Sequence, residues 1–157
     1  MNGLDVIIED DRWEDLQALA SIAVPATLQH QGCDPKTHEV VILGCNDSRI
    51  ADLNQDFRDK AKPTNVLSWP SFDLAAEDDG GTPDTPDEDL GNVAISFETC
   101  AREAIDQNKP FKDHVTHLIV HGVLHLLGYD HIRDRDAALM ENIERQILGK
   151  LGIADPY

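Results

Sequence analysis

The sequence predicts an α+β fold, a single layered domain in which helices cover a small, mixed four-stranded sheet. Three observations support this prediction. The chain has 157 residues, the length of one domain with its own core, so we expect residues 1–157 to form one unit. Its hydrophobic fraction of 41% and charged fraction of 27% are those of globular proteins. Its β-rich and helical segments alternate too irregularly for a doubly wound fold, and no glycine-rich phosphate loop follows a strand.

The four predicted strands are short runs of β-branched and apolar residues. They cover residues 4–9, 38–44, 66–69 and 91–97. Pro70 ends the third strand, because proline has no amide hydrogen to donate to a sheet.

Apolar residues at helical spacing predict five helices. The first begins at Asp11, which with Glu14 resembles a capping box, and Pro25 should kink or end it. Asp47 is the expected cap of the second. The other helices are expected over residues 47–57, 98–108, 112–127 and 133–148.

The formal net charge of −17, from 30 acidic and 13 basic residues, is unevenly distributed. Eight acids and no base fall in residues 73–89, which predicts a solvated, mobile acidic loop over residues 71–90. A field this negative repels nucleic acid and anionic membranes. Arg58, Lys60 and Lys62 nevertheless lie within five residues, so the pattern is compatible with a local basic site on an acidic protein.

Three features predict a reduced, cytoplasmic protein that has no membrane partner. Cys33, Cys45 and Cys100 cannot all pair within one chain, and no two are spaced as CxxC. The first residues lack the basic start and apolar stretch of a signal peptide. The longest apolar run, around residues 118–127, is too short to span a bilayer.

A cluster of histidines near the C-terminus predicts a metal site. His121 and His125 are four residues apart on a predicted helix, so both project from one face. Gly128 lets the helix end and the chain reverse, so His131 can supply a third imidazole. The offsets of 0, 4 and 10, with glycine at 7, are those of the zinc-protease motif HExxHxxGxxH. Three imidazoles leave a fourth tetrahedral position open, which predicts a zinc-binding helix and one catalytic zinc ion.

One position in this motif argues against a protease. The protease motif places a glutamate directly after the first histidine, where it acts as the general base. Here that position is Gly122. No carboxylate is therefore available there to activate water for attack on a peptide.

The other histidines are expected to be structural or supporting. His117 lies one turn before His121 and is expected to pack against or support the site, since a fourth ligand would close it. His114 is expected on the helix surface, and His30 and His38 have no partner pattern.

Three acids near the histidines have two interpretations each. Asp130 can orient the imidazole of His131 or act as a turn acid. Glu141 and Glu144 are expected to be surface charges, with a role in supporting the site as the alternative.

The histidine stretch HGVLHLLGYDH resembles the signature of the YbeY family, the bacterial endoribonucleases and rRNA maturation factors. Three further regions are similar to that family: LNQDFRDKAKPTNVLSWP, LGNVAIS, and HLIVHG with the later MENIE. The similarity extends over residues 40–147, in the same order as the predicted strands and helices.

The resemblance implies an α+β fold and one zinc ion held by His121, His125 and His131. It implies a metal-dependent endoribonuclease specific for single strands, which matures the 3′ end of small-subunit rRNA and takes part in ribosome quality control. The expected partners are therefore RNA and the ribosome or components of its small subunit, and no DNA. The carboxylates of the acidic loop would repel RNA, so we expect them to lie away from its path or to act as a movable guard.

The resemblance also implies that Arg58 is a catalytic residue, because it matches the functionally important arginine of the family. A guanidinium binds phosphate oxygens with two parallel hydrogen bonds and stabilises charge that develops on phosphorus. Lys60 and Lys62 are expected to hold flanking phosphates, with ordinary solvated loop charges as the alternative.

The sequence departs from the family pattern in places. Asn65 and Asn92 stand where the family often has aspartate, and Trp69 replaces a usual phenylalanine. An amide keeps hydrogen-bonding capacity but carries no charge. We expect structural roles for both asparagines.

Two other functions are compatible with the residues. One is a metal-dependent hydrolase of another bond, such as a peptide or amide, against which Gly122 argues. The other is a ribosome-associated module without catalysis, in which the metal only supports the fold. A fourth protein ligand would favour the second alternative.

Overall fold

A computed structural model describes residues 3–58 and 62–157, except for the side chains of Phe57 and Arg58. Nine helices and strands lie in these ranges, and their order along the chain is that expected from the sequence. Within these described residues, no helix has the length and apolar content needed to cross a membrane.

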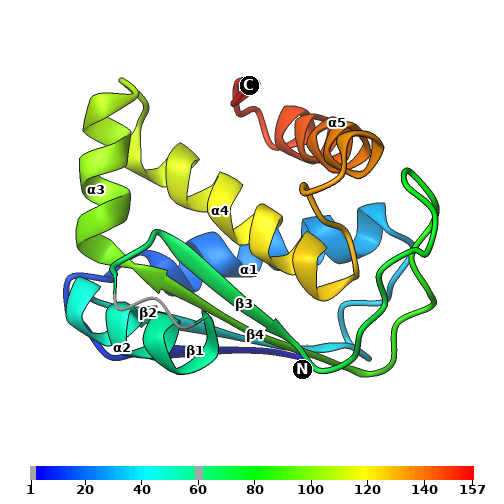
Figure 1. The fold of residues 1–157 in the computed structure, drawn as a ribbon. Helices are drawn as coiled ribbons and strands as arrows, with labels where there is room; N and C mark the ends of the chain where they lie inside the picture. Colours follow the sequence, from blue (N-terminus) through cyan, green and yellow to red (C-terminus); the bar gives the residue numbers. More distant parts are fainter. Residues whose placement is uncertain (1–2, 59–61) are drawn as a thin grey trace.

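The centre of the molecule is a four-stranded mixed sheet with the strand order β1-β2-β4-β3 (Figure 1). The strands are β1 (Leu4–Ile8), β2 (Glu39–Cys45), β3 (Val66–Pro70) and β4 (Asp89–Ser96). β2 runs parallel to both β1 and β4, whereas β3 is an edge strand antiparallel to β4. The predicted α+β fold with a small mixed sheet is confirmed.

Helices cover both faces of the sheet (Figure 1). α1 and α4 pack on one face and α2 on the other, while α5 packs on α4 and α1. The helices are α1 (Leu16–His30), α2 (Asp47–Arg58), α3 (Phe97–Asp106), α4 (Phe111–Leu126) and α5 (Asp134–Lys150). The domain is therefore layered, with α4 lying between the sheet and α5.

The period-two alternation of the strands explains the two cores. Val93 and Ile95 of β4 belong to the larger core, with α1 and α4. Ala94, between them, points to the other face and belongs to the smaller core, with Ile50 and Leu53 of α2. Successive residues of a strand face opposite sides, so β4 is buried on both.

The predicted start of α1 is wrong, because the helix begins at Leu16 and not at Asp11. Of the two effects expected of Pro25, an end to the helix is excluded, because α1 continues through Pro25 to His30. The residues on either side of the proline, Val24 and Leu28 among them, are buried in the core. Their packing outweighs the one backbone hydrogen bond that a proline removes from a helix.

The start of α2 also differs in detail from the expectation. The side chain of Asn46, not that of Asp47, accepts a hydrogen bond from the backbone of the first turn, at the amide of Arg49. Asp47 instead accepts hydrogen bonds from Ser96 and Thr99, both at 2.6 Å. It therefore joins the start of α2 to the start of α3.

The acidic loop between β3 and β4 is attached to the start of α5. The guanidinium of Arg133 donates to the backbone carbonyls of Ala76 and Glu77, each at 2.8 Å. The amide of Gly80 donates to the carboxylate of Asp136, also at 2.8 Å. These contacts hold the middle of the loop beside the chain that carries the last histidine of the cluster.

Candidate metal centre

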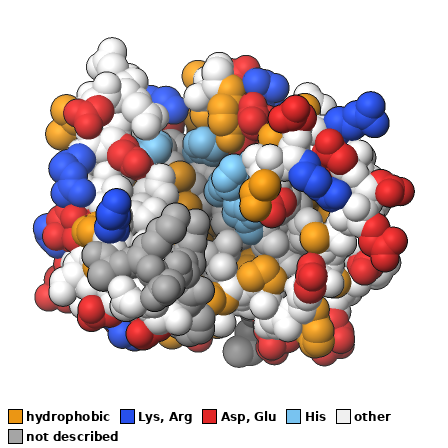
Figure 2. Space-filling view, in the orientation of Figure 1, with side chains coloured by type: hydrophobic (Ala, Val, Ile, Leu, Met, Phe, Trp, Pro, Cys, Tyr) orange, Lys and Arg blue, Asp and Glu red, His pale blue; other side chains and the backbone are white. Residues whose placement is uncertain are grey.

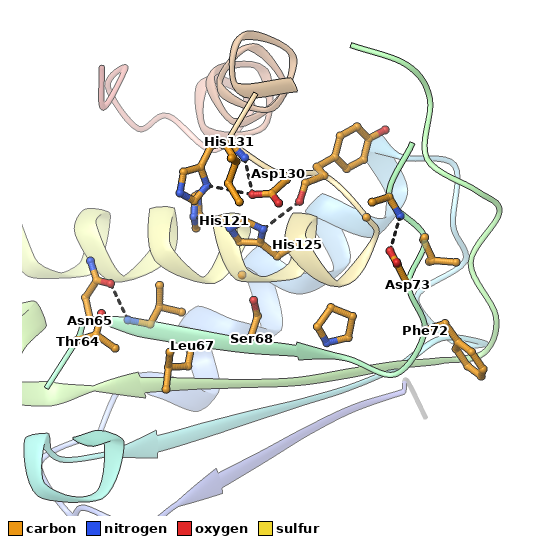
Figure 3. Close-up of a pocket in the computed structure, with 18 residues that line it drawn as sticks. Thr64, Asn65, Leu67, Ser68, Phe72, Asp73, His121, His125, Asp130 and His131 are labelled. Carbon is orange, nitrogen blue, oxygen red and sulfur yellow. Dashed lines mark hydrogen bonds and ion pairs between the residues drawn. The ribbon is translucent and has the colours of Figure 1, made fainter. Parts of the chain in front are cut away.

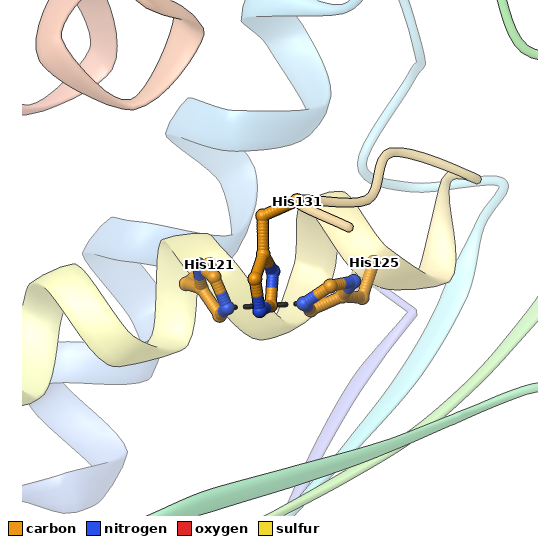
Figure 4. A group of neighbouring side chains, drawn as sticks. All are labelled: His121, His125 and His131. Carbon is orange, nitrogen blue, oxygen red and sulfur yellow. Dashed lines mark hydrogen bonds between the residues drawn. The ribbon is translucent and has the colours of Figure 1, made fainter. Parts of the chain in front are cut away.

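Helix α4 and the turn that follows it bring three imidazoles together. His121 and His125 lie one turn apart on α4, which ends at Leu126. Gly128 then adopts a φ of +100°, a conformation that side chains rarely allow, and the chain returns with His131. One ring nitrogen from each of the three histidines lies within 4.8 Å of the others (Figure 4).

The hydrogen bonds of two of these rings determine where their protons lie. His121 Nδ1 lies 2.6 Å from Oε1 of Glu144, and His125 Nδ1 lies 3.0 Å from the carbonyl oxygen of Tyr129. Both partners are acceptors, so each Nδ1 carries a hydrogen and donates it. The two Nε2 atoms are left with free lone pairs, and they face each other at 3.0 Å. Two lone pairs repel at this distance unless a proton or a cation lies between them.

This arrangement fits a zinc ion. Nitrogen ligands at about 2.0–2.1 Å from a tetrahedral ion lie roughly 3.3 Å apart, close to the observed separation of the Nε2 atoms. Burial, followed by the neighbouring His121 and His131, lowers the pKa of His125 to about 4. The ring is therefore neutral at pH 7, as ligation requires.

The third histidine is held less firmly. The side chain of His131 is 54% exposed, and its Nδ1 lies 3.9 Å from the Asp130 carboxylate, beyond hydrogen-bond distance. That carboxylate instead accepts a hydrogen bond from the His131 amide at 2.7 Å. Of the two interpretations of Asp130, the turn acid agrees with the structure.

Behind the cluster lies Glu144, which is completely buried. Burial acts to raise its pKa, but hydrogen bonds from His117, His121 and Tyr157 outweigh that effect and lower the pKa to about 2. The expectation of a surface charge is wrong for this residue, and the alternative, a contact that supports the site, is confirmed. His117 packs against the same carboxylate, with its Nε2 at 3.4 Å from Oε2.

The sequence contained a signal for the burial of Glu144. It falls on the apolar stripe of α5, whose other buried members are Met140, Ile143, Ile147 and Leu148. A carboxylate on such a stripe is buried with the stripe and needs donors there.

His114 is also buried, at 3% exposure, so the expectation of a surface position is wrong. Its Nε2 lies 2.9 Å from the carboxylate of Glu103 on α3. The same carboxylate accepts a hydrogen bond from the amide group of Asn65 at 3.0 Å, and Asn65 Oδ1 accepts one from the amide of Val66. Asn65 therefore fixes the start of β3, in agreement with the structural role expected for it.

The imidazoles line a cavity of about 640 Å³, whose opposite wall is the edge strand β3 with the residues around it (Figure 3). Figure 2 shows the histidines in a hollow at the centre of this face. The acidic loop contributes Phe72, Asp73, Leu74 and Ala75 to the lining. The beginning of this loop therefore does not lie away from the site.

The position of the missing protease base has no room for a side chain. A Cβ atom added to Gly122 would lie 2.8 Å from Cγ1 of Val93, because α4 lies directly on β4 at this point. The glycine is thus required by the close approach of the helix to the sheet.

The predicted RNA-contacting residues lie mostly outside the described part of the structure. Arg58 is the last residue of α2, and its side chain is not among those described. Lys60 lies outside the described residues altogether. Lys62 is exposed, and its carbonyl accepts a hydrogen bond from Asn54 at 3.0 Å. Their roles stay predictions.

Comparisons with known proteins identify relatives over nearly the whole chain. The profile of the family described as Endoribonuclease YbeY matches residues 6–152. The Endoribonuclease YbeY of Ruegeria pomeroyi is 59% identical, and the match covers 98% of this chain and 97% of that protein. That of Paracoccus denitrificans is 56% identical, covering 98% of this chain and 89% of that protein.

The fold also has a solved counterpart. The solution structure of TM1509 from Thermotoga maritima superposes with a TM-score of 0.59 at 19% identity, covering 98% of this chain and 97% of that one. At this identity the likeness shows the fold alone. The family profile and the curated relatives go further: the chain belongs to the YbeY family.

Proposed function

We propose that this protein is a metal-dependent endoribonuclease whose reaction centre is the cluster of His121, His125 and His131. The observation that supports this most is the convergence of three imidazole ring nitrogens within 4.8 Å beside the cavity, with the Nε2 atoms of His121 and His125 3.0 Å apart. The endoribonucleases among its relatives support RNA as the substrate.

The proposed metal is zinc, one ion per chain, because three imidazoles are a donor set that zinc favours. When bound, zinc would supply Lewis acidity, which polarises a phosphoryl oxygen of the substrate. The chain's own part is to orient the rings of His121 and His125 and to hold a hydrogen on each Nδ1, through Glu144 and the carbonyl of Tyr129.

The proposed substrate is an unpaired RNA strand. The cavity has the volume of a small-molecule pocket, so it suits one unit of a flexible strand and not a duplex. Ser68 presents a hydroxyl on the cavity wall (Figure 3). Arg58 is proposed to stabilise charge on the phosphate, with Lys60 and Lys62 on flanking phosphates.

The family resemblance extends the proposal to a biological role. The substrate would be small-subunit rRNA near its 3′ end, with the ribosome or its small subunit as the partner. Such a role places the protein in the cytoplasm, where bacterial ribosomes are made.

Cleavage of an unpaired RNA by the zinc-loaded protein tests the proposal. Wild type should cleave within the strand, and His125→Ala should not. A matched control is His38→Ala, since His38 is bonded to the carbonyl of Asp34, far along the chain from the cluster. Arg58→Ala should keep its metal, while its cleavage rate falls by about 10²–10³.

Three results would contradict the proposal. Cleavage by His125→Ala at the wild-type rate would remove the histidine cluster from the reaction. Cleavage by Arg58→Ala at the wild-type rate would reduce Arg58 to a surface charge. A zinc-loaded wild type that cleaves no RNA would favour a structural metal.

A further inference from the structure

A buried network lies behind the metal centre, between α4 and α5. Its centre is Glu144, whose carboxylate has no exposed surface. An ionised carboxylate in such a place is stable only when donors satisfy its oxygens. Three side chains supply them: His117, His121 and Tyr157.

The two oxygens of Glu144 have different partners. Oε1 accepts from Nδ1 of His121 at 2.6 Å, the distance of a strong, charge-assisted hydrogen bond. Oε2 accepts from the hydroxyl of Tyr157 and lies 3.4 Å from Nε2 of His117. Tyr157 belongs to the segment after α5, which returns to that helix, where Asp155 pairs with Arg145.

The three metal-site histidines therefore differ in what holds them. His121 has a buried carboxylate, His125 has a neutral backbone carbonyl, and His131 has a carboxylate only at 3.9 Å. A carboxylate on the far nitrogen fixes the tautomer of an imidazole and raises its basicity as a ligand. Among these three, His121 is the ligand whose orientation is most strongly determined.

We propose that Glu144 is a positioning residue for the metal centre, and that Tyr157 and His117 hold its carboxylate in place. Glu144 keeps the imidazole hydrogen of His121 on Nδ1, which leaves the lone pair of His121 on Nε2. The segment after α5 thus contributes to metal affinity through Tyr157, although no atom of that segment is a proposed ligand. This inference rests on the metal site of the proposed function but not on RNA cleavage.

Part of this network permits one other explanation. His117, His121 and Glu144 could themselves hold an ion. However, the 2.6 Å contact joins a donor to an acceptor directly, and the hydroxyl of Tyr157 already occupies Oε2. The geometry thus favours a hydrogen-bond network.

Zinc affinity of the full chain, measured by competition with a chromophoric chelator, tests the proposal. Glu144→Gln keeps the shape but removes the charge, and it should weaken zinc binding by about 10- to 100-fold. Tyr157→Phe removes one donor and should weaken it in the same direction by a smaller factor. Glu141→Gln is the matched control: it removes one charge from the same helix, where Glu141 pairs with Arg145, and should bind zinc like wild type.

A second measurement reads the tautomer directly. In long-range proton–nitrogen NMR spectra of the zinc-free wild type, His121 should carry its hydrogen on Nδ1. Glu144→Gln should increase the population with hydrogen on Nε2, a change that a loss of packing alone would not produce. If Glu144→Gln does not fold, the wild-type tautomer and the affinity of Tyr157→Phe still decide the matter.

Several outcomes would overturn the proposal. One is an NMR spectrum in which His121 of the wild type carries its hydrogen on Nε2. Another is a zinc affinity that is unchanged in both Glu144→Gln and Tyr157→Phe. Two zinc ions per wild-type chain, with one lost in Glu144→Gln, would show a second metal site instead. A wild type that binds no zinc would overturn the metal site of the proposed function as well, whereas failure of the variants alone leaves that site intact.

Discussion

Substituting Gly122 with alanine tests whether the close approach of α4 to the sheet requires glycine at this position of the histidine motif. The added Cβ would lie 2.8 Å from Cγ1 and 3.2 Å from Cγ2 of Val93, inside ordinary contact distance. Val93 is fully buried in β4, which is paired with strands on both sides, and its side chain is stiff at χ1. Neither α4 nor β4 can move away, so we expect a cost near the upper end of the usual range for overpacking, about 2–3 kcal/mol.

Alanine also has the better helix propensity, which offsets about 1 kcal/mol of this cost. The expected net loss in the free energy of unfolding is therefore about 1–2 kcal/mol. Urea denaturation of the metal-free protein, monitored by circular dichroism, measures it.

Gly149→Ala is the matched control for this substitution. Gly149 also lies in a helix, α5, but an added Cβ there meets no atom within 4 Å. It should stabilise the protein by up to about 1 kcal/mol, so the two substitutions should have opposite signs. If Gly122→Ala is as stable as wild type while Gly149→Ala behaves as expected, the steric explanation is wrong. A Val93→Ala background should relieve the clash and give a coupling energy of about 1 kcal/mol or more.

Three other predictions concern charge and protonation. Asn65→Asp places a carboxylate beside Glu103, where the amide of Asn65 donates at 3.0 Å. Thermal unfolding should show that the free energy of unfolding falls by about 1–2 kcal/mol at pH 7, and that the loss shrinks on acidification. An unchanged free energy of unfolding would refute the contact. The pKa of His125 is about 4 in the folded protein and 6.5 ordinarily, so on acidification the unfolded metal-free chain takes up the proton first. The free energy of unfolding should therefore fall by about 2–3 kcal/mol between pH 6.5 and pH 4, and His125→Phe should not show this fall. Burial raises the pKa of Cys45 to about 12, so alkylation at pH 8, followed by mass spectrometry, should modify the half-buried Cys33 first; faster reaction of Cys45 would contradict its burial.

The sequence predicted the metal cluster because local rules determine it. The spacing of His121 and His125 on a helix, and the glycine that reverses the chain before His131, act within eleven residues. Helix geometry alone places the first two rings on one face. The four strands were likewise predicted from short-range pattern, and their mixed sheet is confirmed.

Contacts between distant segments were the part that sequence could not supply. Glu144 approaches His121 only because α5 packs across α4, and Glu103 meets His114 only because α3 packs against α4. Glu144 was expected to be a surface charge, and the sequence offered no expectation for Glu103. Only the packing of one helix on another decides which charged residue of a stripe finds a buried donor.

Pro25 shows the same limit at a helix interior. Local rules end or kink a helix at proline, yet α1 continues to His30. The burial of Val24 and Leu28 against the sheet and α4 is a tertiary effect, which outweighs the local preference.

X-ray absorption at the zinc edge of the reconstituted protein tests the three-histidine site, because it identifies the ligands of the ion. We expect three imidazole nitrogens at about 2.0–2.1 Å and one oxygen from solvent, with one imidazole fewer in His131→Ala. A fourth protein ligand, or a spectrum unchanged in His131→Ala, would contradict an open site built from His121, His125 and His131.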